Sequence, residues 1–524
     1  MTLIAGTGAG EATTQAITPA AAELTAEATC AEDPSFDPHT GKRTGAVPHS
    51  MPDEVSRILE RASRAAPTLA GLSPSIRAGW IGAAADAVAN ASAELVELAE
   101  SETGLVLTRL EGELTRMAAS ARFYAAVAQE GSYLGVSRDD LEGGSTIVRG
   151  NFPVGAVAVF GASNFPFGFG VFGHDVASAL AAGCPVIVKA HPAHPRLSVR
   201  LGEVVRDALA SAGAPEGTFD VVVGFDAGLQ IVDSDVIRAV AFTGSQRAGM
   251  SLAERGARRG IPVYAEMGTV NPVFVTPAAA AHRESIVQGF VASFTLGAGQ
   301  FCTKPGLILV PAGHGFLTAI TAAVSVVHPA PLLTIGIADA YARGLCELDP
   351  AGVSVAPDPA AGYAVAARAI AVSLDQLVSG SRLLDECFGP VALVAEYIDV
   401  ADALEALDRL QPSLAASVFT GTADEDGDDP DAVVAITQLT QRVGRVAVNT
   451  WPTGVVTTWS QQHGGPWPAT SRPDATSVGA GGLARFVRPV SLQNATPSQL
   501  PAMLRPENPW HLPRRLNGRL VLSE

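Results

Sequence analysis

Between residues 154 and 258 the sequence alternates short apolar segments with segments of helical periodicity. The predicted strands are 154–160, 185–188, 219–223 and 236–242, and the predicted helices are 176–182, 197–212 and 245–258. Strands that lack a polar face are typical of a parallel sheet that helices cover on both sides. The sequence therefore predicts an α/β fold with a Rossmann-like nucleotide-binding domain.

The segments on either side extend this prediction. Apolar residues recur at steps of three and four between residues 52 and 130, which predicts several packed helices. After residue 266 a second α/β region begins, with a helix near 283–296 and strands at 306–310 and 391–395. A chain of 524 residues is long enough to hold two or more such lobes.

Composition and charge exclude several kinds of partner. Charged residues make up 17% and hydrophobic residues 47% of the chain, which suits a compact enzyme, and the formal net charge is −17. That charge argues against nucleic acid or an anionic membrane, and no uncharged apolar run is long enough to span a bilayer. The five cysteines lack metal-ligand spacing and no signal peptide is recognisable, so we expect no metal site and a cytoplasmic location.

Cys302 is the candidate nucleophile. It follows Gly297 and Gly299, and glycines beside a cysteine let a substrate approach the sulfur closely. A buried structural cysteine is the commoner role for a single cysteine, and the run itself does not decide between the two. The choice depends on partners elsewhere in the chain.

Two polar residues are candidate partners of Cys302. Glu266 directly follows a buried strand, where a carboxylate suits general-base catalysis, although a capping or salt-bridged glutamate is the alternative. Asn164 lies in a loop rich in glycine and phenylalanine, and its amide can donate a hydrogen bond to an oxyanion. A turn asparagine is the alternative for Asn164.

Candidate nucleotide-binding residues lie where predicted strands end. Phe242, Gly244 and Ser245 lie where a strand closes and a helix opens, and the N–H groups and dipole of such a helix attract a phosphate. An ordinary helix cap by Ser245 is the alternative. Lys189 ends another strand at the carboxyl edge, where the ribose of a nucleotide usually lies, and a solvated strand end is its alternative.

Taken together, the motifs resemble those of the aldehyde dehydrogenase superfamily. The motifs occur in the order of that family from about Asp37 to about Gln493: the Asn164 loop, Lys189, and residues 242–245, 266–268, 299–302 and 386–390. Three runs are similar to the 2-oxoglutarate semialdehyde (2,5-dioxopentanoate) dehydrogenase branch: 183–195, 296–303 and 463–471. That branch also resembles a group of NADP-linked fatty aldehyde dehydrogenases.

The resemblance implies a mechanism for oxidising an aldehyde to a carboxylate. Cys302 attacks the aldehyde carbon to give a thiohemiacetal, and the Asn164 side chain with the Cys302 backbone N–H holds the oxyanion. Loss of a hydride to a nicotinamide leaves a thioester. Glu266 then activates water for its hydrolysis and also serves to take the cysteine proton.

The resemblance also assigns cofactor residues. Glu386 is expected to hold the nicotinamide ribose with Phe388 nearby, Lys189 the adenosine ribose, and Gly244 with Ser245 the pyrophosphate. No carboxylate follows Lys189 in residues 190–194, so nothing there repels a 2′-phosphate, and a protonated His191 would assist it. We therefore expect NADP, with NAD also accepted.

The predicted substrate pocket is aromatic, with lining residues Phe165, Phe169, Phe301 and Thr303. A dioxo acid needs a cation or hydroxyl groups for its carboxylate, and the candidates are Arg116, Arg122, Thr470 and Ser471. Surface or interface pairing is the alternative role for the arginines. A long-chain aldehyde would instead need an open apolar channel, which the phenylalanines permit.

The resemblance implies a cofactor domain, a catalytic domain and a strand pair that joins subunits, with association into a homodimer or homotetramer. The predicted parts are an extension (1–32), a cofactor-binding domain (33–132 and 154–265), a catalytic domain (266–480), oligomerisation strands (133–153 and 481–496) and a tail (497–524). Two alternatives stay open, a non-catalytic cofactor-binding scaffold and an acylating dehydrogenase that transfers the thioester to coenzyme A. The presence of Cys302, Glu266 and Asn164 argues against the scaffold, and Glu266 argues for hydrolysis.

Overall fold

The computed structural model describes residues 32–349, 362–421 and 429–522. The predicted N-terminal extension lies outside this part of the chain, except for Glu32, which begins strand β1 (Glu32–Phe36). Strand β1 pairs antiparallel with β2 (Arg43–Pro48) in a hairpin. Among the described residues, no helix is both long and apolar enough to cross a membrane.

The first large sheet is parallel and has the strand order β7-β6-β5-β8-β9. Its strands are β5 (Ala156–Phe160), β6 (Val186–Lys189), β7 (Phe219–Val222), β8 (Ile237–Gly244) and β9 (Val263–Met267). The connecting helices are α5 (His174–Ala182), α6 (Pro195–Ser211), α7 (Phe225–Asp233) and α8 (Gln246–Arg259). The predicted alternation of strands and helices is confirmed.

Strand β5 shows why its sequence lacks a polar face. Val157 and Val159 pack into one hydrophobic cluster, while Ala156 and Ala158 pack into another. Because successive side chains of a strand point to opposite faces, both faces of this sheet are buried. Small alanines on one face and larger valines on the other therefore fill two different layers of helices.

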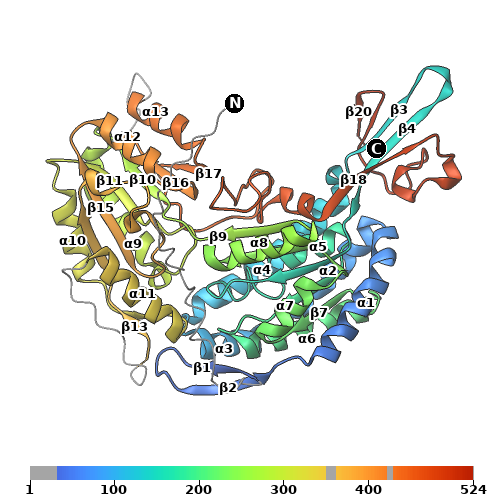
Figure 1. The fold of residues 1–524 in the computed structure, drawn as a ribbon, viewed down its shortest axis with the longest axis horizontal. Coiled ribbons are helices and arrows are strands. Elements are labelled where there is room, and N and C mark those ends of the chain that lie inside the picture. Colours follow the sequence, from blue (N-terminus) through green and yellow to red (C-terminus); the bar gives the residue numbers. More distant parts are fainter. Residues whose placement is uncertain (1–31, 350–361, 422–428, 523–524) are drawn as a thin grey trace, which may run out of the picture. The chain divides into compact units, whose positions relative to one another are not determined.

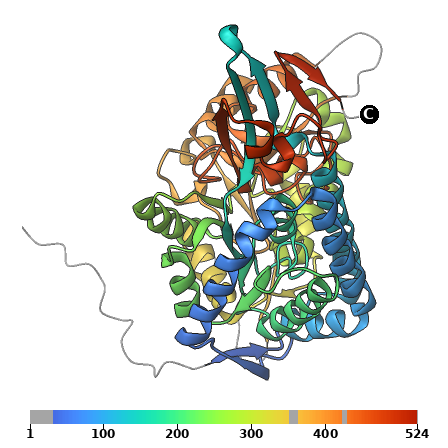
Figure 2. The same cartoon turned by 90° about the vertical axis from the view of Figure 1, so that its right-hand side faces the viewer.

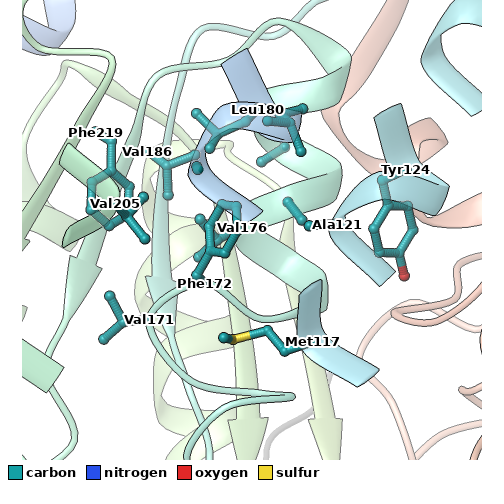
Figure 3. Close-up of a cluster of buried hydrophobic side chains, with 14 of the residues drawn as sticks. Met117, Ala121, Tyr124, Val171, Phe172, Val176, Leu180, Val186, Val205 and Phe219 are labelled. Atoms are coloured by element: carbon teal, nitrogen blue, oxygen red, sulfur yellow. The ribbon is translucent and has the colours of Figure 1, made fainter. Parts of the chain in front are cut away.

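Four helices precede this sheet, as the periodicity of residues 52–130 predicts. They are α1 (Pro52–Gly71), α2 (Pro74–Asn90), α3 (Ser92–Thr103) and α4 (Leu107–Glu130). Helix α4 packs against α2 and α5. Figure 3 shows part of this core, with Met117 and Ala121 of α4 near Phe172 and Val176.

The second large sheet is also parallel and has the order β14-β15-β11-β10-β16-β17. Its strands are β10 (Pro272–Val275), β11 (Leu307–Pro311), β14 (Arg368–Val372), β15 (Val391–Tyr397), β16 (Ser413–Phe419) and β17 (Val443–Val448). Its helices are α9 (Arg283–Thr295), α10 (Phe316–Ser325), α11 (Ile335–Leu348), α12 (Val400–Arg409) and α13 (Pro430–Leu439). Strands β12 (Ala330–Pro331) and β13 (Ala364–Val365) pair antiparallel in a separate two-stranded sheet. Both sheets together confirm the predicted α/β class.

A third, mixed sheet has the order β18-β4-β3-β19-β20, and its β3–β4 hairpin extends away from the large sheets (Figures 1 and 2). The strands are β3 (Val136–Asp140), β4 (Thr146–Pro153), β18 (Val487–Gln493), β19 (Arg514–Leu516) and β20 (Arg519–Val521). Strand β4 pairs antiparallel with β18, so the two predicted segments do meet. Their role in joining subunits remains a prediction.

The C-terminal tail has more structure than its sequence pattern predicts. Strands β19 and β20 are three residues each, too short to show periodicity, and β19 lies parallel to β3. The turn between them is Asn517 and Gly518, both with positive φ. An Asn-Gly pair between short strands is a strong hairpin signal, and that signal was available in the sequence.

We predict that Phe172→Ala destabilises the protein strongly. Phe172 is fully buried in the cluster of Figure 3, so its truncation leaves a cavity and lowers the free energy of unfolding by about 3–5 kcal/mol. Urea unfolding followed by circular dichroism measures this loss. Phe225, which is 71% exposed, provides the control, because Phe225→Ala changes the free energy by about 0.5 kcal/mol or less. Equal losses in both variants would contradict the prediction.

Candidate active site

Cys302 is carried by a tight turn between α9 and β11. Gly297, Ala298 and Gly299 all have positive φ, and this turns the chain back after α9 ends. A Cβ atom at Gly299 would lie 2.2 Å from the carbonyl oxygen of Gly389, so a side chain does not fit there. The glycines predicted to give clearance near Cys302 thus permit the turn and its close packing.

A histidine and a glutamate form a hydrogen-bonded series with Cys302. The Nε2 atom of His463 lies 3.6 Å from Sγ of Cys302, and its Nδ1 atom contacts Oε2 of Glu266. The second oxygen of Glu266, Oε1, accepts a hydrogen bond of 2.9 Å from the backbone N–H of Ser477. Both carboxylate oxygens of Glu266 are thereby held, one by the imidazole ring and one by the backbone.

The charge of His463 is set by its neighbours. Burial alone lowers the pKa of His463, but the negative charge of Glu266 and the hydrogen bonds to Cys302 and Glu266 outweigh it and raise the pKa to about 10. The imidazole therefore carries a positive charge at neutral pH, directly beside the sulfur. A cation in this position stabilises a thiolate.

His463 changes the hypothesis drawn from the sequence. The sequence predicted Glu266 as the group that acts directly on Cys302 and on water, whereas here Glu266 contacts the histidine that faces the sulfur. His463 entered the sequence reasoning only within the run 463–471 that carried a family resemblance. A single histidine between a glutamine and a glycine has no periodic or spacing signal, and it lies 161 residues from Cys302.

Asn164, the predicted oxyanion donor, lies next to the cysteine turn. It is buried, and its Nδ2 atom donates a 2.7 Å hydrogen bond to the backbone carbonyl of Gln300. Arg109 fixes the same loop, because its guanidinium donates a 2.6 Å hydrogen bond to the carbonyl of Asn164 and packs against the rings of Phe165 and Phe301. Arg109, which the sequence analysis missed, therefore joins the asparagine loop to the cysteine turn.

A cavity of about 320 Å³ opens beside Cys302 and His463. Five of the eight predicted substrate residues line it, namely Arg116, Phe165, Phe169, Phe301 and Thr303. The three phenylalanine rings pack edge to face, with ring centroids 5.0 Å apart for Phe165 and Phe301 and 5.7 Å apart for Phe165 and Phe169. The cavity is thus walled by aromatic rings on the side next to the nucleophile.

Three other predicted substrate residues lie elsewhere. Arg122 forms an ion pair with Asp86 at the surface, because it lies on a different side of α4. Thr470 donates to the carbonyl of Gly465, and Ser471 donates to the carbonyl of Val263. Thr470 and Ser471 thus fasten strand β9, which carries Glu266, and they do not line the cavity.

The predicted phosphate and adenosine residues lie at the carboxyl edge of the first sheet. Ser245 is exposed at the N-terminus of α8 and accepts a hydrogen bond from the N–H of Ala248, while a Cβ atom at Gly244 would meet the ring of Phe242 at 2.6 Å. Lys189 ends β6, and its amine forms no hydrogen bond within the described residues. Burial lowers the pKa of Lys189, and only Asp33 opposes this effect.

His191 does not provide the charge that the sequence reasoning gave it. Burial, with the nearby His194 and Lys189, lowers the pKa of His191 well below its usual value. Its Nδ1 atom accepts a 3.1 Å hydrogen bond from the backbone N–H of Ala193, which suits a neutral ring. The prediction that a protonated His191 assists the binding of a 2′-phosphate is therefore wrong, because the ring is neutral at physiological pH.

Glu386 fits the predicted contact with a ribose. Its Oε1 atom is buried without a hydrogen-bond partner, and its carboxylate lies against Gly268, where a Cβ atom would come within 2.0 Å of Oε2. Burial raises the pKa of Glu386 to about 7, although the charge of Lys304 opposes it. An unsatisfied buried oxygen needs a donor, and a sugar hydroxyl supplies one. Phe388 is partly buried two residues further on.

Lys304 fixes the segment that carries Glu386. Its amine donates hydrogen bonds to three backbone carbonyls, those of Cys387 at 2.9 Å, Gly389 at 3.1 Å and Val391 at 2.8 Å. Lys304 follows Cys302 by two residues, so the nucleophile and the predicted ribose contact are held by one connected segment. No motif or spacing in the sequence pointed to Lys304.

Comparison with known proteins decides the family. Residues 25–329 match the family model described as the aldehyde dehydrogenase family. The chain belongs to the aldehyde dehydrogenase family. This confirms the resemblance inferred from the motifs.

The relatives and neighbours of this aldehyde dehydrogenase agree with that assignment. It is 40% identical to alpha-ketoglutaric semialdehyde dehydrogenase 2 of Azospirillum brasilense, over 89% of this chain and 90% of the relative. It is 38% identical to alpha-ketoglutaric semialdehyde dehydrogenase of Acinetobacter baylyi, over 90% of this chain and 92% of the relative. A solved structure of lactaldehyde dehydrogenase shares the fold, with a TM-score of 0.77, 20% identity and coverage of 89% of this chain and 96% of that one.

We predict that His463→Gln slows alkylation of Cys302 in this aldehyde dehydrogenase. The positive charge of His463 stabilises a thiolate, so its loss reduces the rate of reaction with iodoacetamide at pH 7 by roughly 10- to 100-fold. The raised pKa of about 10 means that the advantage of the native enzyme is present at neutral pH and is lost as the pH rises through about 10. Mass spectrometry of the Cys302 peptide measures the rate, and equal rates at pH 7 would refute the role of His463.

Proposed function

We propose that the enzyme oxidises 2-oxoglutarate semialdehyde to 2-oxoglutarate with NADP or NAD. The observation that carries this proposal is one cavity that contains the Cys302–His463 pair, an aromatic wall and the single arginine Arg116. The names of the two relatives, both alpha-ketoglutaric semialdehyde dehydrogenases, support the choice of substrate. A five-carbon dioxo acid has an aldehyde at one end and a carboxylate at the other.

In the first half of the reaction, the aldehyde becomes bonded to Cys302 and loses a hydride. Cys302 attacks the aldehyde carbon as its thiolate, with the positive ring of His463 beside the sulfur, and forms a thiohemiacetal. The Nδ2 atom of Asn164 and the backbone N–H of Cys302 stabilise the developing oxyanion. For this, the Asn164 amide exchanges its present hydrogen bond to the carbonyl of Gln300 for one to the substrate. When bound, the nicotinamide cofactor accepts the hydride.

Hydrolysis of the resulting thioester completes the reaction. The sulfur in a thioester carries no negative charge, so one of the interactions that raise the pKa of His463 is lost. His463 therefore releases its proton to solvent, and the neutral ring then accepts one from the attacking water, with its orientation fixed by Glu266 and Ser477. Attack of the water expels the Cys302 thiolate and releases the free acid.

The cofactor residues fit a pyridine nucleotide. Ser245 and Gly244 lie at the N-terminus of α8, where a pyrophosphate binds favourably, and Glu386 has a free buried oxygen for the nicotinamide ribose. Phe242 and Phe388 lie next to these contacts in sequence. We propose that Lys189 binds the adenosine ribose and favours NADP, because its amine has no hydrogen-bond partner in the described chain and residues 190–194 contain no carboxylate.

An apolar aldehyde of medium or long chain is the second candidate substrate. Apolar residues also line the cavity, namely Met117, Phe123, Val455 and Val456. Val456 is 65% exposed. These residues offer an apolar path that a fatty aldehyde could follow to Cys302. A comparison of 2-oxoglutarate semialdehyde, glutarate semialdehyde and decanal by kcat/KM separates the two, and a preference for decanal would refute the dioxo acid.

We predict that Cys302→Ala abolishes oxidation and leaves cofactor binding nearly intact. Removal of the nucleophile lowers kcat by on the order of 10,000-fold or more, because no other group forms the thioester. Absorbance at 340 nm measures turnover, and fluorescence titration measures the Kd of the cofactor. Analysis of the product of the native enzyme completes the test, since free acid supports hydrolysis and an acyl-coenzyme A would support the acylating alternative.

We predict that kcat/KM is at least about tenfold higher with NADP than with NAD. One hydrogen bond between a charged lysine and the 2′-phosphate contributes about 1.5 kcal/mol or more, which corresponds to this ratio. The contribution depends on Lys189, so Lys189→Met reduces the ratio toward one. Strict use of NAD by the native enzyme would overturn the preference.

A further inference from the structure

One side of helix α4 forms part of the cavity wall. Glu113, Arg116, Met117, Ser120 and Phe123 all line it, and their spacing of three and four residues places them on one face of the helix. Of the residues that line this cavity, all within the described chain, Arg116 alone is an arginine or lysine. A single guanidinium therefore shares the cavity with Cys302.

Arg116 differs from the other arginines of the same helix. Arg109 is bonded to the Asn164 carbonyl and packed against aromatic rings, and Arg122 is paired with Asp86. Within the described residues, the Arg116 guanidinium is exposed and forms no hydrogen bond or ion pair. Its planar array of N–H donors matches a carboxylate, which it can bind with two parallel hydrogen bonds.

Glu113, the acid that lines the same cavity, is held by other groups. Oε1 of Glu113 accepts hydrogen bonds of 2.9 Å from the backbone N–H groups of Phe167 and Gly168, and Oε2 lies 4.0 Å from Nε of Arg109. Burial raises the pKa of Glu113. Arg116 thus adds a positive charge to the cavity of a chain whose formal net charge is −17. Such a local field attracts an anionic substrate.

We propose that Arg116 binds the carboxylate at the far end of the substrate and makes the enzyme selective for semialdehydes over neutral aldehydes. The aldehyde carbon meets Cys302 while the carboxylate meets Arg116 in the same cavity. Arg116 is then a specificity-determining residue, since it contacts the substrate and takes no part in the chemistry at sulfur. This inference rests on the proposed function, because it assumes an aldehyde with an acid group.

The test compares Arg116→Gln with Arg122→Gln in the full-length enzyme. Both variants remove one charge from α4, but Arg122 lies at the surface and serves as the matched control. The substrates are 2-oxoglutarate semialdehyde, glutarate semialdehyde and pentanal, which is a neutral aldehyde of the same chain length. Steady-state kinetics at low and high salt gives KM and kcat for each pair.

We expect Arg116→Gln to raise KM for both acid aldehydes by on the order of 10- to 100-fold and to change kcat and the constants for pentanal by less than about twofold. Arg116→Lys restores part of the loss, and Arg122→Gln has no effect. Added salt raises KM for the acid aldehydes in the native enzyme and has little effect in Arg116→Gln, because screening removes an attraction that the variant lacks.

The outcomes separate this inference from the proposed function. If glutarate semialdehyde depends on Arg116 but 2-oxoglutarate semialdehyde is a poor substrate, the carboxylate contact stands and the proposed substrate fails. If 2-oxoglutarate semialdehyde is a good substrate whose KM is unchanged in Arg116→Gln, the contact fails and the proposed function stands. An equal loss with pentanal would overturn the contact, since it would indicate a general structural defect.

Discussion

The contact between His463 and Glu266 is the interaction on which the active site depends. Two groups that are nearly excluded from solvent lie side by side, and each is costly to bury alone as an ion. The pair is sustained because the Ser477 backbone holds the second carboxylate oxygen and Cys302 meets the far side of the ring. Removal of one member leaves a buried charge without a partner, so the site responds as a unit to substitution.

Hydrogen bonds from two long cationic side chains to backbone carbonyls hold the loops around this pair. Arg109 connects the Asn164 loop with the ring of Phe301, and Lys304 holds three carbonyls of the segment that follows Glu386. Loops carry most of the reacting groups here, and loops are otherwise the most mobile parts of a fold. One buried and one partly buried cation thereby give irregular backbone the rigidity that a preorganised oxyanion site needs.

The parts of the fold that the sequence predicts well are those with a local pattern. Parallel strands such as β5 are apolar on both faces, and the helices before them repeat at three and four residues, so both were recognisable. His463 was missed because its role arises from contacts with residues 161 and 197 positions away. The helical periodicity was enough to show that Arg116 and Arg122 do not line the same cavity. They are six residues apart, and at about 100° per residue they lie on different sides of α4.

The hairpin β19–β20 has a consequence for how the third sheet ends. Without it, strand β3 would present a row of unpaired N–H and C=O groups along the sheet margin, and such a margin readily recruits another chain. Strand β19 covers that row, and the new outer strand, β20, is three residues long and begins with Arg519. On this side the sheet therefore ends in a short strand whose first residue is charged, and β18 is the longer margin open to a neighbour.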